Sequence, residues 1–265
     1  MSTLPVATSN RSAFRWGISD VLTVARRNLQ VLFRTPVAIV FMIIQPIMFV
    51  VLFRYVFGGV FREPGFSYVN YMIPGILVQT TIFGSVGTAI GLAEDLQKGL
   101  IERFRALPMA RLAVLAGRTI SDLFRNVLVL VIITLVGLLI GFRPGGGALD
   151  YLAGCGVMLF FAYCLSWGFA FIGLAAPNSE AAQAMTFPLI FPLTFASSIF
   201  VPVEFMPSWL QGFATYQPVS QTANAVRGLM DGTVHGIATY NSLAWALGAI
   251  LILAPIAVNQ YRKVA

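Results

Sequence analysis

Residues able to do chemistry are few in this chain of 265 residues. Its one histidine is His235, so no pair of imidazoles can hold a metal ion. Its two lysines, Lys98 and Lys263, do not follow a glycine, so the chain has no Walker A motif for binding ATP phosphates. No Gly-x-Ser-x-Gly or Gly-x-Gly-x-x-Gly motif occurs either. The sequence therefore predicts no catalytic residue, no bound cofactor and no metal site.

The best-placed charged residues are Arg118, Asp122 and Arg125, whose spacing lets them pair on one face of a helix. No carboxylate falls in the middle of an apolar run, which disfavours an ion-coupled pump, because such pumps need an ionisable relay inside the membrane. We interpret the three residues as an anchor near the membrane surface. Glu204 and His235 are the best candidates for a lipid-modifying enzyme, but they are far apart in sequence and have no nucleophile beside them.

Composition restricts the class of protein more strongly than any motif. Hydrophobic residues make up 58% of the chain and charged residues 10%, whereas soluble domains carry about 25% charged residues. The mean hydropathy is +0.82. A soluble fold has too little interior to hide this much apolar surface, but a bilayer accommodates it. We therefore predict an all-α integral membrane protein, because a helix satisfies its own backbone hydrogen bonds in lipid.

Six apolar segments are long enough to cross a bilayer, which takes about 17–25 residues. They run approximately over residues 37–57, 72–93, 120–142, 151–176, 181–203 and 241–261. The segment before the first of them is polar and shows no short apolar core with a cleavage site, so we expect no signal peptide. We expect the first apolar segment to stay in the protein as a membrane anchor.

Basic side chains are concentrated on one side of these six spans. Five precede the first span, six lie between the second and third spans or at the edge of the third, and two are in the C-terminal tail. The other four are Arg54, Arg62, Arg143 and Arg227. Because basic residues are enriched in cytoplasmic loops, this distribution predicts that both termini are cytoplasmic. The net charge of +7 lies between apolar runs and not in one basic patch, so we expect no nucleic acid partner.

An amphipathic helix is predicted before the first span, ending at Pro36. Its apolar stripe comprises Ile18, Val21, Leu22, Ala25, Leu29, Leu32 and Phe33. The opposite stripe comprises Thr23, Arg27, Gln30 and Arg34. A helix that is basic on its polar face is suited to lie in the cytoplasmic interface of the membrane.

A second amphipathic helix is predicted in the basic loop between the second and third spans, from Glu94 to Pro108. Its apolar stripe would consist of Leu96, Leu100, Phe104 and Leu107. Its charged residues are Glu94, Asp95, Lys98, Glu102, Arg103 and Arg105. Physical reasoning leaves two interpretations open: a docking surface for a cytoplasmic partner, or a solvated loop that only sets the topology.

Two short helices are predicted on the outer side, between the fifth and sixth spans. The segment 202–236 is too polar to span the membrane and too apolar to extend freely into solvent. One helix is indicated by Phe205, Met206, Trp209, Leu210 and Phe213, which suit the outer membrane interface. A second is indicated over residues 220–230.

The fifth span holds the best candidates for lining a transport path. Pro188 and Pro192 lie there beside four hydroxyl side chains, which are Thr186, Thr194, Ser197 and Ser198. Two interpretations stay open: a bent helix whose hydroxyls line a path, or hydroxyls that bond their own backbone. Gly87 with Gly91, and Gly137 with Gly141, form Gly-x-x-x-Gly pairs. We interpret these pairs as close helix packing within one subunit and not as a dimer contact.

Four passages in a fixed order carry a resemblance to a known family. They are EDLQKGLIERFRALPMARLAVLAGRTISD (Glu94–Asp122), IGFR (Ile140–Arg143), FVPVEFMPSWLQ (Phe200–Gln211) and YQPVSQTANAVRGLMDG (Tyr216–Gly232). The chain resembles the permease subunits of type-2 ABC exporters, the group that includes the daunorubicin-resistance permeases of actinobacteria. The resemblance covers nearly the whole chain, and the ordered set carries it rather than any single motif.

The resemblance implies a division of labour between chains. Two permeases, identical or paralogous, would pair in the membrane, and two copies of an ATP-binding cassette protein beneath them would bind ATP and magnesium. The N-terminal helix would be an interface helix and the loop helix a coupling helix. The residues implied to couple to the ATPase are Glu94, Asp95, Leu96, Lys98, Leu100, Glu102, Arg103, Phe104, Arg105 and Glu180. Glu180 also suits a simple helix start after Asn178.

We therefore expect a transport subunit that is not itself an enzyme, in the cell membrane (inner or plasma membrane) of a bacterium. A cytoplasmic segment with the interface helix would occupy residues 1–36, a six-helix permease domain 37–261 and a cytoplasmic tail 262–265. The expected cargo of this ATP-driven exporter is amphipathic, a drug-like compound or a lipid. The alternatives are a membrane-embedded lipid-modifying enzyme and an ATP-independent channel or secondary transporter.

Overall fold

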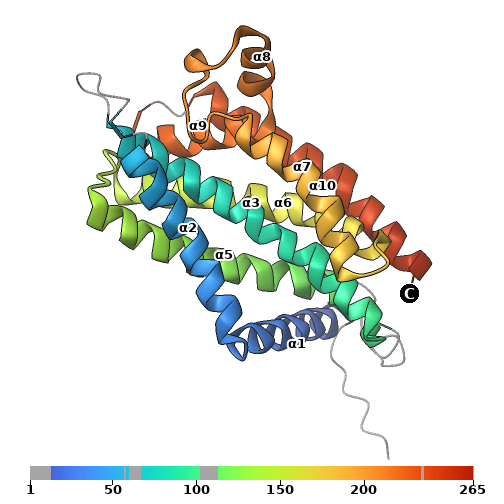
Figure 1. Cartoon of the computed structure of the whole chain (residues 1–265). Coiled ribbons are helices and arrows are strands. Elements are labelled where there is room, and N and C mark those ends of the chain that lie inside the picture. Colours follow the sequence, from blue (N-terminus) through green and yellow to red (C-terminus); the bar gives the residue numbers. More distant parts are fainter. Residues whose placement is uncertain (1–12, 57, 60–66, 102–112, 234–235, 265) are drawn as a thin grey trace, which may run out of the picture.

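The computed structural model describes residues 13–56, 58–59, 67–101, 113–233 and 236–264. Regular structure in these ranges is helical, without strands (Figure 1). The long helices are α1 (Ala13–Phe33), α2 (Pro36–Val56), α3 (Tyr68–Gln97), α5 (Ala113–Ile140), α6 (Ala148–Ala175), α7 (Ser179–Phe195) and α10 (Ile237–Val264). A 3-10 turn, η1 (Val203–Phe205), and two shorter helices, α8 (Ser208–Tyr216) and α9 (Pro218–Met230), lie between α7 and α10.

Five of the described helices are long and apolar enough to cross a membrane: α2, α3, α5, α6 and α10. The predicted fifth span, residues 181–203, differs, because α7 has only 17 residues and ends at Phe195. At 1.5 Å per residue that is about 26 Å, slightly less than the hydrocarbon core of a bilayer, which is about 30 Å. Helical length thus supports five of the six predicted spans.

Side chains from α9 explain why α7 stops where it does. Gln217, at the start of α9, donates to the carbonyls of Leu193 and Ala196 at 2.9 and 3.0 Å. Arg227 donates to the carbonyls of Ser198 and Ile199, both at 2.7 Å. Because side chains satisfy these carbonyls, the backbone needs no further helical turn, and the chain bends through residues 196–201.

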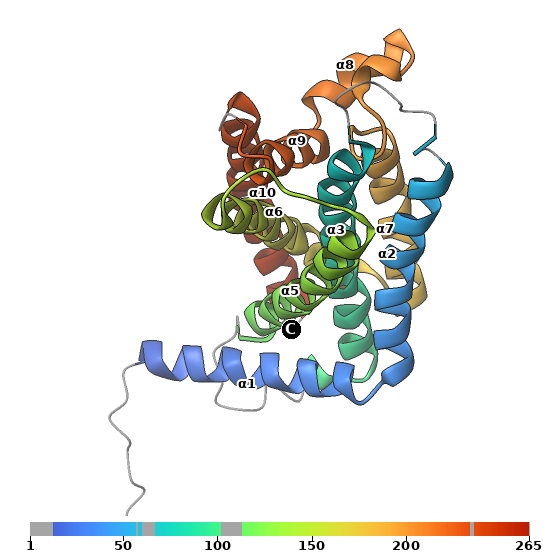
Figure 2. The same ribbon diagram turned by 90° about the vertical axis from the view of Figure 1, so that its left-hand side faces the viewer.

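Helix α3 is the centre of the bundle. Its apolar window is 72% buried, against 17% for α2 and 17% for α10. It packs against α2, α5, α6, α7 and α9. Figure 2 shows the long helices running between α8 at one end of the molecule and α1 at the other, and α10 ends toward the α1 side. We call these the α8 end and the α1 end.

Helix α1 lies across the bundle, as expected for an amphipathic interface helix (Figure 2). Its inner side packs on α5, where a Cβ on Gly117 would come within 2.7 Å of the Cβ of Val24. Leu22 and Phe33, from the predicted apolar stripe, are instead 55% and 61% exposed. The helix therefore has one face fixed to the bundle and an apolar edge left for another environment.

The predicted loop helix from Glu94 to Pro108 is wrong as a continuous element. Helix α3 extends to Gln97, and Gly99 then adopts a left-handed conformation with φ of 63°. The Gly99 N–H donates to the Leu96 carbonyl at 2.9 Å, which is how a glycine terminates a helix. Leu96 and Leu100 therefore lie on either side of a break. Residues 102–112, with Glu102, Arg103, Phe104 and Arg105, lie outside the described residues.

The two short helices predicted between the last two spans are confirmed as α8 and α9. Helix α9 begins with Pro218 at its first turn, a position where the missing N–H costs nothing. It packs against α3, α6 and α10, and most of its side chains are buried. Helix α8 is more peripheral, and Trp209 and Tyr216 on it are 80% and 73% exposed. The expected outer aromatic helix is thus α8, whereas α9 belongs to the core.

Candidate functional site

A cluster of charges lies at the α1 end of α5, formed by Arg118, Asp122 and Arg125. One Asp122 oxygen is 3.1 Å from the Arg125 guanidinium, and the other is 3.9 Å from Arg118 Nε. The Asp122 side chain is only 5% exposed. The predicted pairing on one helical face is therefore confirmed. We call these three residues the α5 charge cluster.

Helix α3 meets this cluster with a row of residues that leave room for the arginines. Arg125 donates to the Gly84 carbonyl, and Arg118 donates to the Gly87 carbonyl at 2.7 Å. The Thr88 hydroxyl donates to Asp122. A Cβ on Gly87 or on Gly91 would collide with the guanidinium of Arg125 or Arg118, respectively. Gly87 and Gly91 therefore leave space on α3 for the guanidinium groups of Arg125 and Arg118.

This arrangement refines the interpretation of the Gly-x-x-x-Gly pairs. Gly87 and Gly91 do face another helix of the same subunit, but the partners they admit are arginine side chains. At Gly137 the neighbours of an added Cβ would be Ile73 and Phe142, while nothing lies within 4 Å of the same position at Gly141. Gly141 has φ of +104° and ends α5. Packing within the subunit thus accounts for three of these glycines, and chain reversal accounts for Gly141.

Helix α1 is tied to α3 by an ion pair beside the cluster. Arg27 lies 3.2 Å from Asp95, whose side chain is 11% exposed. One turn away, Lys98 pairs with Glu94 at 3.2 Å, but both side chains are well exposed, so this pair contributes little. Together with the contact between α1 and Gly117 of α5, the Arg27–Asp95 pair makes α1, α3 and α5 one mechanical unit at the α1 end.

Two adjacent hollows border this unit. The first, which we call the polar pocket, has a volume of 350 Å³ and lies between α1, α3 and α5, with Arg27, Asp95, Arg118 and Asp122 in its wall. The second, which we call the aromatic groove, has a volume of 410 Å³ and lies mainly between α2, α3 and α5. They share Leu32, Gly87, Ile90 and Arg125 in their walls, so they lie side by side.

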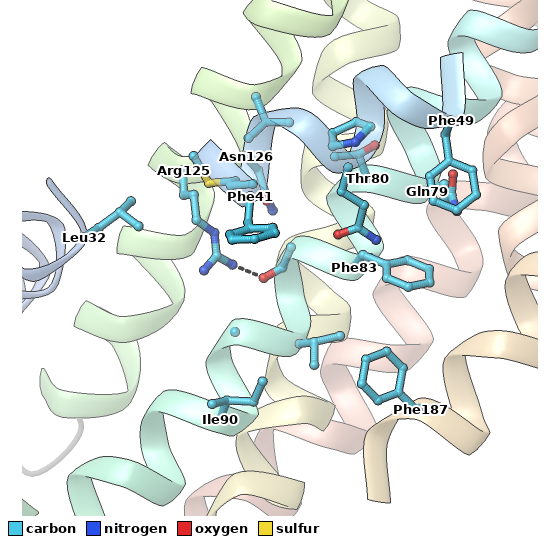
Figure 3. Close-up of a pocket in the computed structure, with 17 residues that line it drawn as sticks. Leu32, Phe41, Phe49, Gln79, Thr80, Phe83, Ile90, Arg125, Asn126 and Phe187 are labelled. Atoms are coloured by element: carbon cyan, nitrogen blue, oxygen red, sulfur yellow. Dashed lines mark hydrogen bonds between the residues drawn. The ribbon is translucent and has the colours of Figure 1, made fainter. Parts of the chain in front are cut away.

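The aromatic groove combines rings with a few amide and hydroxyl groups. Figure 3 shows Phe41, Phe49, Phe83 and Phe187 around it, and the hydrogen bond from Arg125 to the Gly84 carbonyl. Gln79 is 3% exposed, and no described residue lies within hydrogen-bonding distance of its Oε1 atom. A buried acceptor of this kind gains free energy when a donor reaches it. The groove can therefore hold an apolar molecule that carries a polar group.

A second buried arginine, Arg227 of α9, lies toward the α8 end and is held differently. It donates to the Tyr71 carbonyl at 2.8 Å, to the carbonyls of Ser198 and Ile199, and to Asn224 Oδ1 at 2.9 Å. Its guanidinium carbon lies 3.6 Å from the centre of the Tyr71 ring. Burial lowers the pKa of Arg227, and nearby Tyr71 opposes that shift. We call Arg227 with these partners the α9 anchor.

The described coupling residues lie at the end of α3 and at the start of α7. Leu96 and Leu100 are partly buried and Lys98 is exposed, whereas Asp95 is buried and turned toward Arg27 of α1. Glu180 is exposed in the first turn of α7, where the Asn178 side chain accepts a hydrogen bond from the Ala181 N–H at 2.7 Å. Contact of these residues with an ATPase stays a prediction.

The four predicted path-lining residues are buried inside the subunit. The hydroxyls of Thr186 and Ser197 donate to the carbonyls of Ala182 and Thr194 in their own segment, at 2.7 and 2.5 Å. Ser198 donates to Asn224 Oδ1 at 3.0 Å, and the Thr194 hydroxyl has no hydrogen-bond partner among the described residues. None of the four borders the polar pocket or the aromatic groove. Their role in a path stays a prediction.

Sequence reasoning treated the α5 charge cluster only as an anchor and counted Arg227 only as one charge among many. A usable signal was present for the cluster, because Gly84, Gly87 and Gly91 repeat at the same helical spacing as the charges of α5. No comparable sequence signal marks Arg227, because its partners are backbone carbonyls distant in sequence.

Comparison with known proteins now gives the class. The sequence profile described as ABC-2 type transporter matches residues 19–230, so the chain belongs to this family. It is a multi-pass membrane protein and a membrane subunit of an ABC transporter, and the resemblance noted from the four passages is confirmed.

Curated relatives agree over nearly the full length. Daunorubicin resistance ABC transporter permease protein DrrB1 of Streptomyces coeruleorubidus is 33% identical over 258 residues, covering 97% of this chain and 91% of the relative. Probable doxorubicin resistance ABC transporter permease protein DrrC of Mycobacterium tuberculosis is 24% identical over 256 residues, covering 96% and 92%. Putative transport permease ycf38 of Cyanophora paradoxa is 27% identical over 224 residues, covering 80% and 74%.

Proposed function

We propose that this chain is the membrane-spanning subunit of an ATP-driven exporter in the cell membrane of a bacterium. In this proposal α7 is the sixth span, and the α1 end of the bundle faces the cytoplasm together with both termini. A second permease, identical or paralogous, completes the transport path, and two ATP-binding cassette subunits bind at the α1 end and carry ATP and magnesium. This chain performs no bond chemistry.

The observation that carries the proposal is the joining of α1, α3 and α5 at one end of the bundle. The last turn of α3 is tied to α1 through Asp95 and Arg27, and α3 is tied to α5 through the charge cluster. A force applied to the chain just after Gln97 would therefore reach α1 and α5 as well as α3. That is the arrangement a permease needs if a separate ATPase is to move it.

The proposed cargo is amphipathic, a drug-like compound or a lipid. The aromatic groove supports this class, because it offers rings together with Arg125 and the Gln79 oxygen, which no described residue bonds. The names of two relatives refer to daunorubicin and doxorubicin resistance, which fits a drug-like cargo without assigning one here. Binding the cargo more tightly in one conformation than in another is the permease's own contribution to transport.

The proposal is tested by co-expressing the chain with candidate ATP-binding cassette subunits and measuring co-purification and ATP-driven transport in vesicles. Replacing Leu100 and Phe104 together by Asp is expected to abolish both, because charges would replace the apolar part of the docking surface. The control is Leu149→Asp, which also replaces an apolar side chain by Asp, at a residue that is 82% exposed in the first turn of α6.

Two results would count against the proposal. Transport that continues without any ATPase indicates a channel or secondary transporter. Unchanged co-purification of the Leu100 and Phe104 double variant, with Leu149→Asp also unchanged, removes the docking surface from this segment.

A further inference from the structure

The polar pocket holds more positive than negative charge among its described residues. Its basic residues are Arg27, Lys98, Arg118 and Arg125, and its acidic residues are Glu94, Asp95 and Asp122. Arg27 pairs with Asp95 and Lys98 pairs with Glu94, so Arg118 and Arg125 must share Asp122. One guanidinium of the pocket is therefore left without a carboxylate of its own.

Distances identify Arg118 as that guanidinium. Arg125 is 3.1 Å from Asp122, whereas Arg118 is 3.9 Å away, beyond hydrogen-bonding distance. Arg118 donates to the Gly87 carbonyl, but its buried Nε atom has no hydrogen-bond partner in the part of the chain that the structure describes. A buried positive charge with an unused donor is costly unless an anion completes it. Guanidinium groups suit phosphate oxygens in particular, because two N–H groups can bind two oxygens at once.

The surroundings of the pocket restrict which anion fits. Residues of α1, the amphipathic helix that crosses the end of the bundle (Figure 2), form one wall of the pocket. Helices of this kind lie where lipid headgroups meet a membrane protein. The pocket adjoins the aromatic groove, with which it shares Leu32 and Ile90 in its wall. Phe41, which borders that part of the groove, is 68% exposed (Figure 3). An anion attached to an apolar chain would fill both hollows, whereas a free anion would fill only one.

We propose that the polar pocket binds the phosphate headgroup of an anionic phospholipid from the leaflet in which α1 lies. The phosphate pairs with Arg118, and one acyl chain lies against Leu32, Phe41 and Ile90. The bound lipid fills the space between α1, α3 and α5 and fastens α1 to the bundle. This site depends on the membrane placement of the bundle and not on ATP-driven transport.

The test uses the purified full-length chain in a neutral detergent, titrated with phosphatidylglycerol or with phosphatidylcholine and followed by native mass spectrometry. Both lipids carry a phosphate, but the quaternary ammonium of phosphatidylcholine offsets its charge beside a pocket with an excess of basic residues. Phosphatidylglycerol is therefore expected to bind about tenfold more tightly. Arg118→Gln is expected to remove this preference, and Arg118→Lys to keep part of it. The control is Arg262→Gln, which removes an exposed basic side chain from the end of α10 and should leave the preference unchanged.

A second variant covers the case in which Arg118→Gln does not fold. Ser121 borders the same pocket, and its hydroxyl lies 2.7 Å from the Arg118 carbonyl oxygen. Ser121→Asp would supply the missing carboxylate, so it is expected to abolish the preference while retaining Arg118. A preference that survives in Ser121→Asp would overturn the proposal, as would equal affinity for the two lipids.

Inorganic phosphate distinguishes a lipid from a free anion. Phosphate is expected to compete with phosphatidylglycerol only at far higher concentration, because it gains nothing from the apolar groove. Competition at a concentration similar to that of the lipid would overturn the lipid assignment. None of these outcomes changes the result expected for ATPase co-purification, so failure of the lipid site and failure of the proposed function can be told apart.

Discussion

The bundle buries arginine in two regions, and it satisfies them in opposite ways. In the α5 charge cluster, Arg118 and Arg125 share one carboxylate, and hollows border the group. In the α9 anchor, Arg227 makes no ion pair with the described residues, and carbonyls, an amide and the Tyr71 ring surround it instead. The first region has an unused donor and open space, while every nitrogen of Arg227 has a partner.

This difference suggests different roles for the two regions. The α9 anchor is suited to hold helices in place, and the α5 charge cluster is suited to rearrange. Carbonyl oxygens of a fixed backbone cannot change their charge or leave, so the α9 anchor keeps α9, α3 and the bend after α7 together. The α5 charge cluster can exchange partners, because a new anion or a shift of α1 changes which guanidinium Asp122 favours. Four predictions test this contrast.

The largest expected effect comes from Arg227→Met. The variant keeps an apolar side chain of similar length but leaves the carbonyls of Tyr71, Ser198 and Ile199 without their donor. We expect a loss of at least about 3 kcal/mol in the free energy of unfolding, measured by denaturation in mixed micelles. Arg143→Met is the control, because Arg143 is exposed and its guanidinium donates to the Leu138 and Phe142 carbonyls of its own segment. Equal losses in the two variants would show that Arg227 is not an anchor.

Asp122→Asn is expected to cost about 3 kcal/mol in the same measurement, because it leaves two guanidinium groups without a counter-charge. Unlike a loss at the α9 anchor, this loss of stability should be partly reversed by a second substitution. The double variant Asp122→Asn with Arg125→Gln removes one charge of each sign, so it should be more stable than Asp122→Asn alone. No added stability in the double variant would mean that the ion pair does not hold the cluster.

Gly91→Ala is expected to cost about 1–2 kcal/mol, because the added methyl group takes the place of the Arg118 guanidinium. Gly248→Ala in α10 is the matched control, since nothing lies within 4 Å of its added Cβ and Ala favours a helix. Thermal unfolding in detergent measures both. If the two variants unfold alike, α3 does not provide a slot for Arg118.

The smallest effects are expected for the ion pairs at the end of α3. Arg27→Gln should cost up to about 1 kcal/mol, because Asp95 is mostly buried. Lys98→Gln should change stability by less than about 0.5 kcal/mol, because both partners are solvated. Comparison of the two melting curves checks the order, and a larger effect for Lys98 would reverse our ranking.

Much of the fold could be predicted from the sequence because apolar length and helical period are local properties. The spans at α2, α3, α5, α6 and α10 and the short helices α8 and α9 follow from them. The end of α7 could not be predicted, because Gln217 and Arg227 cap its carbonyls from another helix. The break at Gly99 was readable in principle, since glycine after a basic residue commonly ends a helix.

The candidate site was predicted only in part. The pairing of Arg118, Asp122 and Arg125 follows from their spacing along one helix, which is visible in the sequence. Which helix receives them depends on tertiary packing, and so does the burial of Asp95 against α1. Ser197 and Ser198 were chosen for their hydroxyls beside prolines, a pattern that does not reveal that both are buried near α9.

Helix α3 carries both arginine regions on one continuous rod, with Tyr71 near its start and Gly84 to Gly91 in its second half. Inserting a single residue between Ile76 and Phe83 would turn everything that follows by about 100° and shift it by about 1.5 Å. The carbonyl that receives Arg227 and the glycines that receive α5 could then no longer face their partners together. The spacing along this stretch, more than the identity of its apolar side chains, is therefore the property that the chain must keep.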